Sequence, residues 1–248
     1  MEQLSIVIPS HRRAEHVRTL GAVTDPIVCV AEDQEAEYRE HNPAVEIVVH
    51  PATVIGLPAK RQWIYEYFGS CFMLDDDVPY LVDLMRFTKD ATPVKVDPAK
   101  ARALIERCAD TARQVGAYLF GFNNALRPDH YQAQDPLSFT GYIPGHSTGI
   151  LAGSKLYWNA KLRTTDDYWV SALNAYHHRI VVKDLRYCAF QVGTFASSGG
   201  QASHRTMAQE RESTRILQEH FGEAIKPKRA TAGRKATHSE QRMLKLPY

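Results

Sequence analysis

The chain has 248 residues, 44% of them hydrophobic, and a formal net charge of +2 at pH 7. That length fits one large α/β domain or two small ones with a true core, and the small charge excludes a strong global electrostatic field. Four widely spaced cysteines without a C-x-x-C pair argue against zinc, and no apolar stretch approaches the roughly 18 residues of a membrane span. The first residues lack the features of a signal peptide, so we expect a soluble protein of the cytoplasm, or of the host cytoplasm if the chain is viral.

The first 75 residues alternate short apolar runs with polar or amphipathic segments. The apolar runs predict four strands, at 5–8, 26–30, 45–49 and 72–74. The segments between them predict three helices, at 12–20, 35–40 and 58–68. Strands that alternate with helices in this way indicate a parallel sheet with crossover helices.

The second half is patterned less regularly. Helices are predicted at 98–114, 166–176 and 203–221, and strands at 117–120, 180–182 and 188–190. Residues 138–151 read as a glycine-rich, aromatic loop-and-strand region. A tail of low hydrophobicity follows, which we expect to be loosely ordered. Its basic residues either bind DNA phosphates or are simply solvated: Lys226, Lys228, Arg229, Arg234, Lys235, Arg242 and Lys245.

Three consecutive carboxylates end the fourth predicted strand. Asp75, Asp76 and Asp77 follow the apolar run 72–74, and ligands of open α/β sheets bind beyond the carboxyl ends of the strands. Because neighbouring anions repel, a bound cation best explains the cluster, and oxygen ligands suit Mg²⁺ or Mn²⁺. The alternative is an acidic turn whose side chains cap the next helix.

The other predicted strands place polar residues at the same edge. Those singled out as donor-binding candidates are Pro9, Ser10, Arg12, Glu32, Asp33, Gly56, Lys60 and Arg61. A glycine loop entering a helix beside two cations favours phosphate. The chain has neither a P-loop nor a G-x-G-x-x-G turn. An acidic cluster without either motif points to nucleotide-sugar chemistry.

At this point the chain resembles a known family. The segments 5–10, 56–62 and 74–77 are similar to the nucleotide-binding half of GT-A glycosyltransferases. The segments 56–78 and 198–206 are similar, more narrowly, to the TET/JBP-associated glycosyltransferases of DNA base-modification systems, notably those of phages. The resemblance covers roughly residues 3–225. It implies an α/β, GT-A-like, mostly parallel central sheet flanked by helices, with a metal site at the strand ends.

The resemblance also implies roles for individual residues. Asp75 would lie near the ribose or base of the donor, and Asp77 would bind the metal with help from Asp76. His204 matches a late metal or diphosphate ligand, and Arg205 a diphosphate contact. An exposed loop histidine and a solvated cation at a helix start are the equally good alternatives. A uracil or ribose pocket would be lined by Pro9, Glu32 and Asp33.

An acidic pair at the start of a later helix supplies the candidate base. In inverting GT-A enzymes such a pair takes the proton of the acceptor, because a hydroxyl is a poor nucleophile until a carboxylate accepts its proton. We assign Asp167 as the base and Asp166 as its neighbour or an acceptor ligand. The alternative is helix capping, since Thr165 and both acids suit a helix start. Tyr142 and His146, in a Gly/Pro-rich segment, either shape the acceptor pocket or belong to an ordinary loop.

The sequence therefore predicts one GT-A-like domain over residues 1–225, with a nucleotide-binding half (1–80), an acceptor half (81–225) and a basic tail (226–248). Its expected activity is metal-dependent transfer of a sugar from a nucleotide-sugar, UDP-linked, to a hydroxymethylated base in DNA, with no membrane partner. Three alternatives stay open. The glycosyltransferase could act on a glycan or a small molecule, the chain could be a nucleotidyltransferase, or it could be a nucleic-acid-binding protein that keeps the fold and has no catalytic activity.

Overall fold

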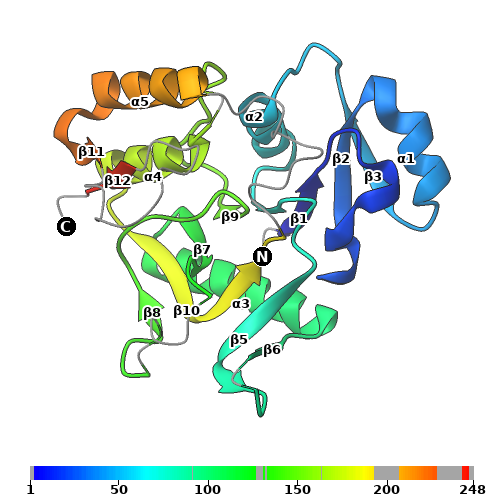
Figure 1. The fold of residues 1–248 in the computed structure, drawn as a ribbon, viewed down its shortest axis with the longest axis horizontal. Coiled ribbons are helices and arrows are strands. Elements are labelled where there is room, and N and C mark those ends of the chain that lie inside the picture. The colour runs from blue at the N-terminus through cyan, green and yellow to red at the C-terminus, as the bar shows by residue number, and fades with distance from the viewer. Residues whose placement is uncertain are drawn as a thin grey trace.

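A ten-stranded sheet forms the centre of the computed structural model, which describes residues 3–90, 92–126, 131, 133–162, 164–192, 207–227 and 242–245. Along the sheet the strands are β3 (Glu46–His50), β2 (Ile27–Ala31), β1 (Ser5–Pro9), β4 (Cys71–Leu74), β9 (Ser147–Ile150), β7 (Leu119–Asn123), β10 (Val181–Phe190), β5 (Tyr80–Phe87) and β6 (Pro93–Lys95), and β8 (Leu137–Ser138) pairs with β10. Figure 1 shows helices on both faces. The fold is therefore the mixed α/β fold that the sequence predicts.

The first four strands of the sheet order form a purely parallel block. Strands β3, β2, β1 and β4 run parallel to one another, as the alternating pattern of the first 75 residues predicts. Beyond β4 the directions mix: β9 is antiparallel to β4 and β7, β7 and β10 are parallel, and β5 and β6 add antiparallel neighbours. The carboxyl ends of the four parallel strands consequently meet at one edge.

Side chains alternate between two helical layers across the sheet. Ile6 and Ile8 of β1 face the cores that include α3 (Pro98–Val115) and α1 (Glu35–His41), whereas Val7 faces the core formed with α2 (Leu57–Phe68), α4 (Asp166–His177) and α5 (Met207–Phe221). This alternation follows from the two-residue period of a strand. It places α2 and α4, which carry several site candidates, on the same face.

Several predicted elements differ in the structure. The helix expected at 12–20 is instead two short 3₁₀ helices, η1 (Ala14–His16) and η2 (Arg18–Gly21), because Thr19 and the Arg18 amide bond to the acidic loop. The two strands expected at 180–182 and 188–190 are one strand, β10. Strands β5 and β6 were not predicted, since charged residues such as Asp83 interrupt the apolar pattern of β5.

The expectation of a loosely ordered tail is wrong for its described part. Residues Ile225–Pro227 form β11, which follows a 3₁₀ helix, η6 (Gly222–Ala224), and pairs with β12 (Arg242–Leu244) as a two-stranded ribbon. Leu244 packs against the core formed with α4 and α5. The rest of the tail, and the first residues of the helix expected at 203–221, lie outside the described residues.

Among the described helices, none has the length and apolar content needed to cross a bilayer.

Candidate active site

The candidate site lies at the edge where the parallel strands end. There β1 runs into Ser10, β2 into Glu32, β3 into Pro51 and β4 into Asp75. Because Leu74 pairs with Ser147 at the start of β9, the loop before β9 reaches the same edge, and the Asp75 amide donates to the His146 carbonyl over 3.1 Å. The two halves of the chain therefore meet at the acids.

The three consecutive aspartates point to three different partners. Asp75 Oδ1 accepts from Arg61 Nη2 at 2.6 Å, and Asp76 accepts from Arg13 Nη1 at 2.6 Å and from Ser10 Oγ at 2.7 Å. Among the described residues, Asp77 Oδ1 accepts a neutral bond, from Gln191 Nε2 at 3.1 Å. Cations of the described residues thus form ion pairs with Asp75 and Asp76, and none of them forms an ion pair with Asp77.

Asp77 has the properties of a single metal ligand. Burial raises the pKa of its carboxyl to about 6, and repulsion from Asp75 adds to this, while the Gln191 bond opposes it. Within the described residues, no group of three His, Cys, Asp or Glu side chains gathers as a preformed metal site. Because Mg²⁺ is usually held by one or two carboxylates plus substrate phosphates, one desolvated carboxylate that no described cation pairs with fits such an ion. His204 and Arg205, the other predicted ligands, lie outside the described residues.

The two cations of α2 turn inward. Lys60 is buried and its Nζ donates to the Ser10 carbonyl, and burial lowers the pKa of the amine to about 8. Arg61 is only 2% exposed, and its two terminal nitrogens bond Asp75 and Asp166. A free phosphate-binding pair was the sequence prediction. In the structure Arg61 instead joins carboxylates from two elements.

The remaining donor-binding candidates surround the ends of β1, β2 and β3. Pro9 ends β1, and the Arg12 amide donates to Gln34 at 2.8 Å from a residue with φ of 54°. Glu32 accepts from the Ala52 amide at 3.1 Å, and Asp33 from Gln34 at 3.4 Å.

Gly56 precedes α2 at a φ of 90°, a conformation that favours glycine. These residues share one edge, and their roles toward a nucleotide stay predictions.

The acidic pair of α4 lies directly across Arg61 from the strand-end acids. Asp166 Oδ2 accepts from Arg61 Nη1 at 2.5 Å. Asp167 Oδ2 accepts from the Tyr142 hydroxyl at 2.5 Å and from the Gly145 amide at 3.3 Å. Thr165 makes no side-chain cap bond, although Asp167 Oδ1 accepts from the Tyr168 amide at 2.9 Å.

The surroundings of Asp167 suit proton transfer. Burial raises the pKa of its carboxyl, the neighbouring Asp166 adds to this, and Tyr142 and Arg61 oppose it. Burial and the adjacent Asp167 raise the pKa of Tyr142 well above its ordinary value, so the phenol stays a donor. A carboxylate whose pKa is moved toward neutrality is a better general base than an exposed aspartate.

Several residues of this site were not found from the sequence. Arg13 and Gln191 hold the aspartates, and Gly145 lets its loop approach, because an added Cβ would lie 3.0 Å from Arg61 Nη1 and 3.2 Å from Asp167 Cβ. Of these, only Gly145 lies in a segment that the sequence marks as a possible pocket, because its small and aromatic residues surround Tyr142. The others are distant in sequence from the groups that they contact.

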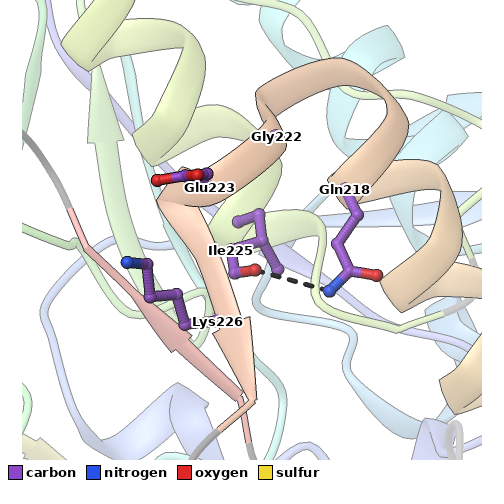
Figure 2. A pocket seen from close by; sticks show the side chains of 5 residues that line it. All are labelled: Gln218, Gly222, Glu223, Ile225 and Lys226. Atoms are coloured by element: carbon purple, nitrogen blue, oxygen red, sulfur yellow. Dashed lines mark hydrogen bonds between the residues drawn. The ribbon is translucent and has the colours of Figure 1, made fainter.

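An open surface pocket lies elsewhere on the molecule. Figure 2 shows it at the junction of α5, η6 and β11, lined by Gln218, Gly222, Glu223, Ile225 and Lys226. Gln218 Nε2 donates to the Ile225 carbonyl across it at 3.4 Å. None of the predicted site residues lines this pocket, so it has no part in the site described above.

Comparison with known proteins identifies the family. The model of the TET-Associated Glycosyltransferase family matches residues 4–200. The chain belongs to this family. The enzyme is therefore a glycosyltransferase, which confirms that prediction and sets aside the nucleotidyltransferase and silent-binder alternatives.

Solved structures give a distant likeness of fold. The crystal structure of TarS 1–349 from S. aureus has 10% sequence identity and a TM-score of 0.46, over 90% of this chain and 72% of that chain. The complex of TarS 1–349 with UDP-GlcNAc has the same identity and TM-score, over 87% of this chain and 66% of that chain. No curated protein matches the chain.

Proposed function

We propose that this glycosyltransferase transfers a sugar from a nucleotide-sugar, UDP-linked, to the hydroxymethyl group of a modified base in DNA, and that it requires Mn²⁺ or Mg²⁺. The observation that carries the proposal is the bridge made by Arg61. Arg61 holds the acids of α4 beside the strand-end acids. The carboxylate that would accept the proton of the acceptor therefore lies next to the acids that would bind the nucleotide-sugar donor. Transfer to an alcohol needs both groups at one place.

The donor would lie over the strand ends. Asp77 would hold the metal together with the diphosphate, and the metal would act as a Lewis acid toward the leaving diphosphate. Ser10 and Arg13 fix Asp76, and Arg61 fixes Asp75, so the two residues that precede Asp77 are held in place. A loop restrained in this way keeps its third carboxylate in position for the donor.

Asp167 would act on the acceptor. Its carboxylate takes the proton of the hydroxymethyl group, whose oxygen bonds to the anomeric carbon. The bond from that carbon to the diphosphate breaks, and its electron pair leaves with the diphosphate. The rings of Tyr142 and Tyr168, tilted by 54° with centroids 5.1 Å apart, lie beside Asp167 and would offer aromatic surface to a base.

Family membership supports the choice of acceptor. The family description connects the chain with TET proteins, and the resemblance from the sequence connects it with DNA base modification. A hydroxymethyl group supplies the alcohol that Asp167 would activate, whereas an unmodified cytosine offers no comparable group. Enzymes that act on a base take it out of the stack, and aromatic side chains beside the catalytic group suit an extruded base.

The metal and donor arm is tested by Asp77→Asn, which keeps the size of the side chain and removes its charge. We expect the variant to lose the Mn²⁺-dependent thermal stabilisation by UDP, which in the wild type reaches about 2.7 kcal/mol at 100 times the Kd. Asp90→Asn makes the same change at an exposed position between β5 and β6 and should behave as wild type. Undiminished transfer in excess EDTA would refute the metal requirement.

A further inference from the structure

Lys183 of β10 is a cation for which the described residues supply no counter-charge. Its side chain is partly buried, and it makes no hydrogen bond or ion pair with any residue in the described part of the chain. Burial lowers the pKa of its amine. A partly desolvated ammonium that lacks a partner is costly in the free protein, and an incoming anion would remove that cost.

The strand alternation sets the direction of this side chain. Val181 belongs to the core shared with α4, and Val182 to the core shared with α3. Lys183 therefore projects to the α4 face, as does Ser138, which lies directly opposite it in the β8–β10 pair. This is the face of the sheet on which Asp166 and Asp167 lie.

The ammonium also lies beside the loop that leads to the candidate base. A Cβ built on Gly141 would be 3.5 Å from Lys183 Nζ. The next residue, Tyr142, donates its hydroxyl to Asp167. The ammonium of Lys183 thus lies near Gly141, and the proposed base bonds the next residue of the same loop.

We propose that Lys183 binds a backbone phosphate of the acceptor strand, next to the nucleotide whose base reaches Asp167. The inference rests on the proposed function, since it takes DNA as the acceptor. A nucleotide extruded toward Asp167 brings its flanking phosphates to the same face, and Lys is a good partner for a phosphate. A neutral glycan acceptor would give this cation nothing to bind.

The test measures the affinity for a hydroxymethylcytosine-containing oligonucleotide as a function of salt, by fluorescence anisotropy. Lys183→Gln should weaken binding and reduce the slope of log K against log salt by about 0.7–0.9, the contribution of one phosphate contact. Lys89→Gln, which removes the same charge at an exposed position between β5 and β6, should leave the slope unchanged. Lys183→Arg keeps the charge and should restore most of the slope.

A second arm compares two acceptors. Lys183→Gln should raise the KM for the oligonucleotide several-fold and leave the KM for the free hydroxymethyl nucleoside, which has no phosphate, as in the wild type. An unchanged slope in Lys183→Gln, or an equal rise in KM for both acceptors, overturns the inference while leaving transfer to DNA intact. A reduced slope without any sugar transfer to DNA supports the phosphate contact and refutes the proposed function.

Discussion

At the scale of single residues, the contact that defines the site is the one between Tyr142 and Asp167. The two are 25 positions apart, and their 2.5 Å bond cannot be derived from sequence spacing. The sequence does point to Asp167, because two acids at a helix start suggest either a cap or a base. It does not show that Tyr142 and Gly145 hold that carboxylate, since a loop approaches it only in the folded chain.

Tyr142→Phe tests this contact through the pH dependence of turnover. Asp167 is a base only when ionised, so activity is lost as the pH falls through its pKa. The Tyr142 hydroxyl stabilises the ionised form, and removing it raises the pKa of Asp167 further, which moves the acid limb of the kcat profile to higher pH. Activity well above that limb should change little. An acid limb that stays in place would show that Tyr142 does not act on the base.

At the scale of elements, α2 connects the acidic loop after β4 with the start of α4 through Arg61. The sequence predicts these three elements well, because each carries a clear periodicity or an abrupt change from apolar to acidic residues. It does not predict that Arg61 faces inward, since a cation in the first turns of a helix normally reads as exposed or phosphate-binding. β5 was missed for a related reason: its Asp83 is buried, and Lys100 lies 3.7 Å from its carboxylate.

Arg61→Gln tests whether this connection holds the fold together. The variant leaves Asp75 and Asp166 without their shared cation, and breaking a buried pair typically costs about 3–5 kcal/mol in the free energy of unfolding. Adding Asp166→Asn should recover part of the loss, because one uncompensated carboxylate is then removed. Arg39→Gln breaks an exposed pair with Glu35 and should cost at most about 1 kcal/mol. Equal losses for the two arginine variants in urea unfolding would contradict the connecting role.

At the scale of the whole molecule, we propose that the parallel block β3-β2-β1-β4 binds the donor and that the mixed strands with α4 bind the acceptor. The parallel block was predictable, because its strands are short, apolar and regularly spaced. The mixed half was not, since β9 and β8 come from a loop-like region and β10 is a single strand that carries Asp184 and Arg186 in its middle. The central claim is that these two sides meet to glycosylate a hydroxymethylated base.

The most direct measurement is mass spectrometry of nucleosides from DNA incubated with the enzyme, UDP-glucose or UDP-N-acetylglucosamine, and Mn²⁺. Hydroxymethylcytosine should gain the mass of one sugar, ordinary cytosine should not, and Asp167→Asn should lower the rate by about 10²–10⁴ while still binding UDP. Asp166→Asn run in parallel shows which acid is the base. Sugar on ordinary cytosine, or no sugar on hydroxymethylated DNA with any nucleotide-sugar alongside transfer to a glycan, would contradict the account.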